Sequence, residues 1–126
     1  MLVATLLSWS DARQACQALG DGWDRGSIRT EQVNQFLAGL LSSETWIGAT
    51  DLDTEGNWVW ASDGQPFWRG NGATGSAVNG AYVNWNGTEP NGGKSDCARV
   101  VPALATTWAD VECSALRSSV CEGPAG

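Results

Sequence analysis

The first third of the chain places apolar residues at helical spacing, which predicts two helices. Ser8 stands three residues before Asp11, a pair that can cap the N-terminus of a helix. The apolar face that follows stops at Gly20 and consists of Trp9, Ala12, Cys16 and Leu19. A second helix is expected to begin near Thr30, with an apolar stripe made of Val33, Phe36, Leu37, Leu40 and Leu41. We expect both stripes to pack in the core.

The rest of the chain alternates between short apolar runs and polar, glycine-rich segments, which predicts strands joined by loops. The predicted strands lie at residues 1–7, 46–49, 58–60, 82–85, 98–101 and 119–121. Residues 71–80 are too polar and too rich in glycine to be more than a loop. Two helices followed by a loop-rich sheet indicate an α+β fold.

Composition narrows the class of protein. The chain has 126 residues, of which 42% are hydrophobic, so we expect one globular domain. Acidic residues outnumber basic ones by 14 to 7, and a formal charge of -7 leaves no basic face for nucleic acid. No apolar run approaches the roughly 20 residues that a membrane-spanning helix needs. A single lysine among the 7 basic residues, with much alanine and glycine, is typical of a GC-rich, bacterial gene.

The sequence contains no histidine, and this excludes several kinds of site. A Ser-His-Asp or Cys-His catalytic group is impossible, as is a zinc or haem site with a histidine ligand. Carboxylate chemistry, an oxygen-ligated metal and binding without catalysis remain.

Four cysteines are present: Cys16, Cys97, Cys113 and Cys121. None belongs to a Cys-x-x-Cys pair, which excludes zinc-ribbon and thioredoxin-like sites. An even number in a small, glycine-rich chain favours two disulfides and an oxidising compartment, with four reduced thiols as the alternative. The residues alone allow three pairings.

Side chains with oxygen ligands gather on the loops of the second half. They are Asp51, Asp53 and Glu55 after the run at 46–49, Glu89 and Asn91 around Pro90, and Asp96 and Asp110. A disulfide between Cys97 and Cys113 would bring Asp96 and Asp110 into one neighbourhood. Calcium takes six to eight oxygen ligands, so this pattern suits a calcium site. The alternative is a set of solvated loop acids that each cap a turn.

The order of these residues resembles the C-type lectin-like domain over nearly the whole chain. Ser8-Trp9, Ala12 and Cys16 are similar to the start of the first helix in that family. The other matching motifs are Trp46-Ile47-Gly48, Glu55-Gly56, Asn84-Trp85, Glu89-Pro90-Asn91, Asp96-Cys97, Trp108-Ala109-Asp110, Cys113 and Val120-Cys121-Glu122.

The resemblance implies a fold with two helices, two small antiparallel sheets and a long loop region that carries ligands. It also implies two disulfides, Cys16–Cys121 and Cys97–Cys113, and the short form of the domain. Four tryptophans are implied to be structural rather than sugar-stacking: Trp46, Trp58, Trp85 and Trp108.

The resemblance further implies a sugar site. In sugar-binding members, calcium is held by the Glu and Asn of Glu-Pro-Asn, a further Glu, and the Asn-Asp of Trp-Asn-Asp. Two vicinal sugar hydroxyls complete its coordination. Here Glu89, Asn91 and Asp110 match, and the resemblance implies a cis bond between Glu89 and Pro90. The order Glu-Pro-Asn resembles the mannose type, which takes sugars with adjacent equatorial hydroxyls: mannose, glucose, fucose and N-acetylglucosamine.

Two positions depart from that ligand set. Ser95 stands where the family has an acid, and Ala109 stands where it has the Asn of Trp-Asn-Asp. We expect weaker calcium binding, toward the millimolar range, because fewer charged ligands remain. Asp96 is a candidate to replace the ligand missing at Ser95.

A second, auxiliary calcium site of the family would draw on Asp51, Glu55 and Asp96. Its fourth ligand, the acid after Glu-Pro-Asn, is Gly92 here, and Asp53 is a candidate substitute.

The resemblance therefore implies a non-catalytic carbohydrate-binding module that binds glycans with the help of Ca2+. We expect one domain over residues 1–126, excised from a longer secreted or cell-surface protein and monomeric when isolated. Ser95 and Ala109 favour the main alternative, a calcium-independent interaction domain that binds a protein or another surface.

Three further possibilities concern single segments. A glycosidase with paired carboxylates, Glu89 with Asp110 or Asp51 with Glu55, would need a deep cleft that a short loop cluster does not suit. Residues 70–80 either shape a pocket or form a flexible insertion, and we expect an insertion. Residues 86–88 match a glycosylation sequon.

Overall fold

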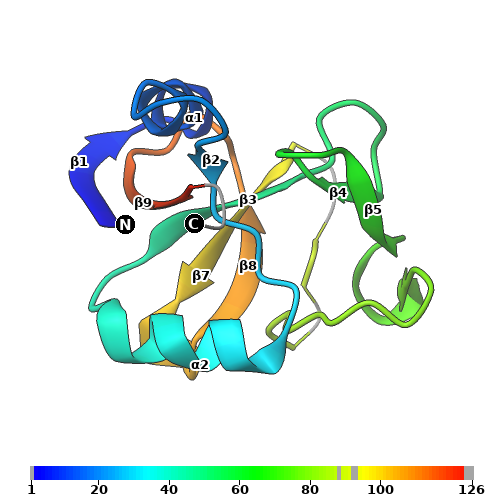
Figure 1. Cartoon of the computed structure of the whole chain (residues 1–126). Coiled ribbons are helices and arrows are strands. Elements are labelled where there is room, and N and C mark those ends of the chain that lie inside the picture. Colours follow the sequence, from blue (N-terminus) through cyan, green and yellow to red (C-terminus); the bar gives the residue numbers. More distant parts are fainter. Residues whose placement is uncertain (1, 88, 92–93, 124–126) are drawn as a thin grey trace.

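The computed structural model describes residues 2–87, 89–91 and 94–123. Helices α1 (Trp9–Gln17) and α2 (Glu31–Leu40) lie on opposite sides of the strands (Figure 1). The strands of the described part are β1 (Leu2–Leu7), β2 (Asp24–Arg25), β3 (Thr45–Thr50), β4 (Asn57–Trp60), β5 (Gln65–Arg69), β6 (Ser76–Ala77), β7 (Cys97–Val101), β8 (Thr107–Val111) and β9 (Arg117–Glu122). Two 3-10 turns are η1 (Gly72–Thr74) and η2 (Pro102–Leu104). The predicted α+β class is confirmed.

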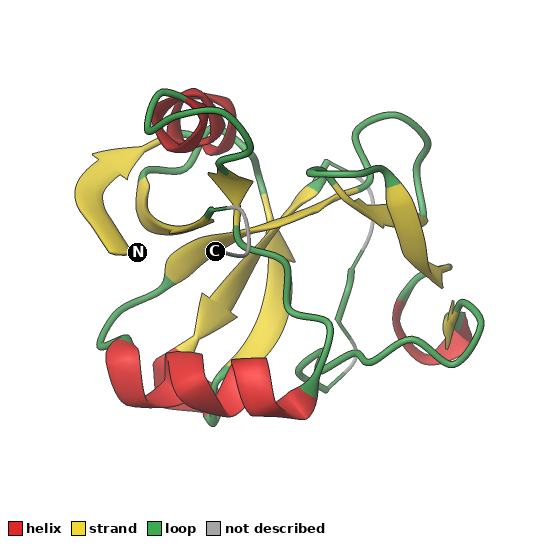
Figure 2. Cartoon of the chain, in the orientation of Figure 1, coloured by secondary structure: helices red, strands yellow, loops and turns green. Residues whose placement is uncertain are grey.

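Strand β3 is the centre of the sheet. Different parts of it pair antiparallel with β4 and β7, and parallel with β9. Strand β9 also pairs with β1 and β2, β7 pairs with β8, and β5 joins β4 to β6. The antiparallel groups implied by the resemblance are thus connected through β3. A long stretch with few regular elements separates β5 from β7 (Figure 2).

The residues of β3 supply the core on both faces of the sheet. Trp46 packs with Trp9 and Ala12 of α1, whereas Ile47 belongs to a larger cluster that includes Leu37 of α2. All six residues of β3 are buried, which fits a strand covered on both faces.

Both predicted helix starts are confirmed. The Ser8 side chain accepts a hydrogen bond from Asp11 N at 3.3 Å, and the Thr30 side chain accepts one from Val33 N at 3.2 Å. The prediction that Leu19 lies on the buried face of the first helix is wrong. Helix α1 ends at Gln17, Leu19 N bonds to Cys16 O in a tighter turn, and Leu19 points outward with 41% of its surface exposed.

The predicted apolar stripe of α2 is only partly a core stripe. Leu37 and Leu41 are buried, but Val33, Phe36 and Leu40 are exposed, with Phe36 at 69%. The helix instead turns Asn34 inward, where its amide bonds to Thr106 O and to Trp108 Nε1. The buried face of α2 is therefore rotated relative to the prediction.

The strand predictions hold except in the loop region. Residues 82–85 form a single bridge, between Trp85 and Trp108, rather than a strand. The structure adds β2, β5 and β8, which the sequence pattern did not predict. Residues 71–80 are more than a loop, since they contain η1 and β6, and β6 pairs with β5.

Both disulfides implied by the resemblance are confirmed. Cys16–Cys121 ties α1 to β9, and Cys97–Cys113 ties the start of β7 to the turn after β8. Trp46, Trp58 and Trp108 are fully buried, and Trp85 packs against the same core, as the structural role requires. No helix in the described ranges is long and apolar enough to span a membrane.

Candidate functional site

The segment Glu89–Asn91 crosses the loop region beside β8. Its Glu89–Pro90 bond is cis, as the resemblance implies. Glu89 N donates to Asn86 O at 2.9 Å, and the Pro90 ring is fully buried, so the segment is anchored at both its start and its centre. Asn91 is exposed at the end of this anchored stretch.

Asp110 lies against this segment. Strand β8 carries Asp110, which is only 4% exposed, and its Oδ1 accepts a hydrogen bond from Asn91 N at 2.8 Å. Burial raises the pKa of Glu89, and the Asp110 carboxylate raises it further, while Arg99 and the Asn91 amide lower it. The structure therefore brings Glu89, Asn91 and Asp110 together; we call these three residues the principal group.

Arg99 is a neighbour that the sequence analysis missed. It lies on β7 opposite Ala109, and its Nη1 donates to Asp110 O at 3.1 Å. Its Nε lies 2.5 Å from Glu44 Oε1, so the guanidinium charge is shared with a carboxylate away from the principal group. A charged residue in the middle of the apolar run at 98–101 was the signal available in the sequence.

The two departures from the family pattern lie where oxygen ligands are missing. Ala109 is buried on β8, and its methyl group has no ligand atom. Ser95 is half-buried and carries a hydroxyl rather than a carboxylate. Gly92, the other missing ligand, lies outside the described residues, as does Thr88 of the sequon.

A second set of carboxylates forms beside the start of β7. One oxygen from each of Asp51, Glu55 and Asp96 lies within 4.8 Å of the others; we call these three residues the auxiliary group. The turn after β3 supplies Asp51 and Glu55, and Asp96 is held next to them because Asp51 N bonds to Asp96 O at 3.1 Å.

The electrostatics of the auxiliary group favour a bound cation. Oδ1 of Asp51 and Oδ1 of Asp96 are buried, and neither receives a hydrogen bond from the described part of the chain. Burial raises the pKa of Asp51 to about 7; the Asp96 and Glu55 carboxylates raise it too, and the bond from Gly56 N opposes them. Buried carboxylates this close need either a proton or a cation between them.

Asp53 does not take part in this cluster. Among the described residues it lines a different cavity of about 450 Å3, together with Trp9 and Arg13 of α1 and Asn57 of β4. Arg13 is already paired with Asp24, its Nε lying 3.0 Å from Asp24 Oδ1.

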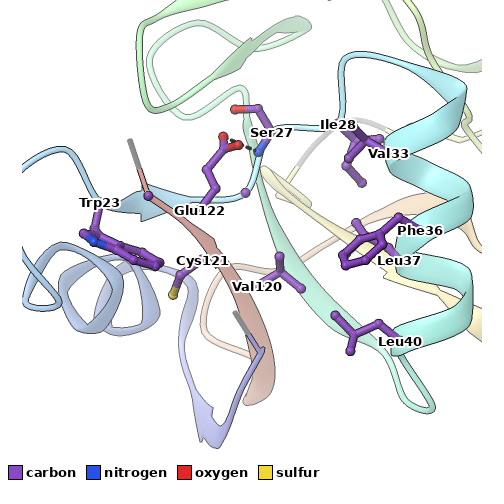
Figure 3. A pocket seen from close by; sticks show the side chains of 12 residues that line it. Trp23, Ser27, Ile28, Val33, Phe36, Leu37, Leu40, Val120, Cys121 and Glu122 are labelled. Carbon is purple, nitrogen blue, oxygen red and sulfur yellow. Dashed lines mark hydrogen bonds between the residues drawn. The ribbon is translucent and has the colours of Figure 1, made fainter. Parts of the chain in front are cut away.

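An apolar cavity of about 230 Å3 lies between α2 and β9, away from both carboxylate groups (Figure 3). The exposed face of α2 forms one wall with Val33, Phe36 and Leu40, and Val120 and Trp23 lie opposite. Among the described lining residues, Glu122 is the only carboxylate, and it accepts a hydrogen bond from Ser27 N at 2.9 Å. The described part of the lining therefore lacks the clustered oxygens that a cation requires.

Comparisons with known proteins agree on one family. Residues 5–123 match the family described as Lectin C-type domain. The chain is 32% identical over 120 residues to C-type mannose receptor 2 of Mus musculus, an alignment that covers 92% of this chain and 7% of the receptor. The chain therefore spans only about 7% of the length of that relative.

Solved structures show the same fold. The cow C-type carbohydrate-recognition domain of CD23, solved in the presence of GlcNAc2Man3 oligosaccharide, is 27% identical with a TM-score of 0.77; the match covers 99% of this chain and 87% of that one. Herring type II antifreeze protein is 23% identical with a TM-score of 0.79, covering 100% and 90% of the two chains, and this likeness concerns the fold alone.

Proposed function

The chain belongs to the C-type lectin domain family, and from that premise we propose that it is a non-catalytic, calcium-dependent carbohydrate-binding module. The glycan would bind at the principal group, Glu89, Asn91 and Asp110. The relatives that bear on function are named as a receptor and a carbohydrate-recognition domain, and neither name describes an enzyme.

The observation that carries this proposal is the contact between the Glu-Pro-Asn segment and β8. Asn91 N donates to Asp110 Oδ1, and the Glu89 carboxyl is close enough to Asp110 for its pKa to rise. The carboxylates of Glu89 and Asp110 and the side chain of Asn91 thus lie close together, on segments 19 residues apart in the sequence. Such a set is suited to a hard cation and, beside it, to sugar hydroxyls.

The described residues fit calcium in both groups. Asp51 and Asp96 each hold a buried oxygen without a donor, and the principal group offers Glu89, Asn91 and Asp110. Bound calcium would supply positive charge that offsets the carboxylates and two coordination positions for sugar hydroxyls. The carboxylates of Glu89 and Asp110 would also accept hydrogen bonds from those hydroxyls, and the Asn91 amide would donate one.

The order Glu-Pro-Asn supports the mannose class of sugars within this proposal. Mannose, glucose, fucose and N-acetylglucosamine share adjacent equatorial hydroxyls. A motif that places an accepting carboxylate before a donating amide suits such a pair of hydroxyls. The names of two relatives point the same way, since one is a mannose receptor and the other was solved with a mannose-containing oligosaccharide. Because Ser95 and Ala109 supply no carboxylate or amide, we expect calcium dissociation constants of about 1 mM.

The setting of the domain is also part of the proposal. Two disulfides favour an extracellular, secreted or cell-surface location. We propose that residues 1–126 act as one glycan-binding domain of a longer, bacterial protein and are monomeric when isolated. Avidity for glycans would then come from the valency of the parent protein.

A thermal melt with and without calcium tests the proposal. Calcium at about 100 times its dissociation constant should stabilise the folded state by about 2.7 kcal/mol, which raises the Tm by several degrees. Magnesium at the same concentration is the control for ionic strength, and it should have less effect because it demands a tighter octahedral site. Melting curves that coincide in calcium, magnesium and chelator would contradict a calcium-dependent lectin.

A second candidate is a calcium-independent interaction domain. The buried methyl group of Ala109 at a ligand position favours it, as does the Arg99 guanidinium at the carbonyl of Asp110. A glycan array in calcium and again in chelator separates the two candidates. Binding that requires calcium supports the first candidate, and binding that survives in chelator, or no glycan binding in either condition, supports the second.

A further inference from the structure

The glycine-rich segment 70–75 contacts the centre of the Glu-Pro-Asn motif. Gly72 N, in the first turn of η1, donates a hydrogen bond to Pro90 O at 2.8 Å. Pro90 has no N–H of its own, so this bond fixes the motif through its carbonyl. The neighbours of Pro90, Glu89 and Asn91, belong to the principal group.

The other end of the same segment contacts the loop of the auxiliary group. Gly70 N donates to Gly56 O at 2.9 Å, and Gly56 N donates to Asp51 Oδ2 at 2.8 Å. Hydrogen bonds donated by glycine amides therefore link the Asp51 carboxylate to Gly56 and Gly56 O to Gly70, and the segment continues to Gly72 and Pro90.

Trp68 on β5 holds this segment in place. Its Nε1 donates to Gly70 O at 2.9 Å, and its ring lies against Gly75. A Cβ atom at Gly75 would lie 2.6 Å from Trp68 Cζ2, and one at Gly70 would lie 2.8 Å from the Gly75 Cα. Only glycine allows the segment to fold this tightly on the ring.

We propose that segment 70–75, clamped on Trp68, is a positioning strut that fixes the Glu-Pro-Asn motif relative to the auxiliary group. The inference rests on the proposed function, since the strut positions the residues that would bind calcium and sugar. Gly70 and Gly72 are positioning residues, because their contacts with the loops of the two groups are made by backbone N–H groups.

Electrostatics explain why such a strut is useful. Without a cation, Glu89 repels Asp110, and Asp51 repels Asp96, so like charges act to separate the loops. Backbone hydrogen bonds from glycine amides carry no net charge and hold the loops together in the same arrangement. The ligand set is thereby preorganised, and less ordering is needed when a ligand binds.

Gly75→Ala tests the strut with a matched control in the same segment. Gly75 has φ -82°, which alanine adopts without strain, so the substitution acts only through its collision with the Trp68 ring. Gly80→Ala is the control: Gly80 has φ +70° and open space around its Cβ position, so it strains the loop without displacing the strut.

Two measurements separate positioning from general stability. In chelator, amide exchange at Gly72 and the NMR shift of the Asn91 amide should change in Gly75→Ala and stay as in wild type in Gly80→Ala. At saturating calcium, Gly75→Ala should bind methyl mannoside about fivefold more weakly, and Gly80→Ala should stay within about twofold of wild type. A merely structural role would lower the Tm and leave the affinity of the folded protein unchanged.

Unchanged Gly72 exchange and Asn91 shift in a folded Gly75→Ala protein overturn the strut, whether or not the wild type binds sugar. If the wild-type protein binds neither calcium nor sugar, the proposed function is wrong. The measurements in chelator need no ligand, so they still test the strut by themselves. If Gly75→Ala does not fold, Trp68→Phe removes the bond to Gly70 O without a collision. A change in the amide exchange of Gly72 in Trp68→Phe supports the strut. Amide exchange at Gly72 that equals that of the wild type overturns it.

Discussion

Asp51 is a buried carboxyl whose environment suits a cation better than solvent. It is 2% exposed and shares its surroundings with two other carboxylates, and its pKa is raised to about 7 from an ordinary 3.8. One bond from Gly56 N stabilises its charged form. If calcium binds here as proposed, a proton and the ion would compete for the same oxygen atoms.

This competition predicts how stability depends on pH in chelator. Because the folded pKa of Asp51 lies above the unfolded value, its contribution is fully present below about pH 3.8 and is lost as the pH rises through about 7. The free energy of unfolding of wild type, relative to Asp51→Asn, should fall over this window by on the order of a few kcal/mol. Urea unfolding of both proteins on either side of the window measures the difference.

Saturating calcium should reverse the order of the two proteins above the window, because the ion favours the charged form of Asp51 and Asp51→Asn loses a ligand. Parallel pH profiles for the two proteins in chelator would show that Asp51 titrates normally.

In the proposed site, the Asn91 side chain would bind calcium and also donate a hydrogen bond to a sugar hydroxyl. Asn91→Asp replaces the amide donor with a carboxylate beside Glu89 and Asp110. We expect the affinity for methyl mannoside to fall about tenfold, because the variant loses the hydrogen bond from the Asn91 amide to a sugar hydroxyl. That bond would lie beside charged carboxylates, where hydrogen bonds are stronger. Calorimetry in saturating calcium measures this loss.

Asn79→Asp is the matched control, since Asn79 is exposed, sits at φ +53° where Asn and Asp are both tolerated, and gains the same charge. Equal affinities for the two variants would remove Asn91 from the sugar site.

At the scale of elements, α2 supports the site through one buried amide. Asn34 donates to Thr106 O at 3.1 Å and accepts from Trp108 Nε1 at 2.9 Å, and Trp108 stands two residues before Asp110 on β8. Asn34→Ala leaves the buried Trp108 Nε1 donor without its acceptor, whereas Thr106 O keeps a bond from Asn84 Nδ2. We therefore expect a loss of about 2 kcal/mol in the free energy of unfolding. Gln35→Ala, at the exposed neighbouring position, should change it by less than about 0.5 kcal/mol. Chemical denaturation of both variants checks this, and equal losses would mean that the amide has no special role.

The helix starts could be predicted from the sequence because their capping is local. The side chains of Ser8 and Thr30 each accept a hydrogen bond from the backbone N–H three residues later in the chain. Residues close in the sequence therefore determine the cap. The buried face of α2 could not be predicted, since it depends on the distant partner of Asn34. A polar residue turned inward and Phe36 turned outward contradict the simple rule that apolar residues face the core.

The loop elements were predicted less well for a similar reason. Strand β5 contains Pro66, and β8 contains Ala109 and Asp110, so neither has the apolar alternation of a typical strand. Residues 70–80 are expected from the sequence to be a flexible insertion, but segment 70–75 is held by the ring of Trp68 and the carbonyl of Pro90. Glycine amides leave no side-chain signal in the sequence, so this role could not be predicted.

At the scale of the whole molecule, two disulfides close loops of different length. Cys16 and Cys121 are 105 residues apart, and Cys97 and Cys113 are 16 apart. In the chain-entropy model, replacing Cys16–Cys121 by two serines should cost about 4–5 kcal/mol of stability, and replacing Cys97–Cys113 about 3 kcal/mol. Urea unfolding of the two double variants measures the difference. A larger loss for Cys97–Cys113 would contradict the loop-length argument and would mean that this disulfide acts through the folded site.

The candidate ligands were predictable as residues but not as two separate groups. The motif order implied Glu89, Asn91 and Asp110, and the structure brings them together. Asp96 was expected to serve either group, and it lies with Asp51 and Glu55. Arg99 was missed because its effect on Glu89 arises only when β7 and β8 pair.

The most direct test of the account is calorimetric titration of methyl mannoside into the wild-type domain, once at about 10 mM calcium and once in chelator. The account predicts saturable one-site binding in calcium that disappears in chelator and is weakened in Asn91→Asp. Equal binding with and without calcium, or no binding in either, would contradict a calcium-dependent sugar site at Glu89, Asn91 and Asp110.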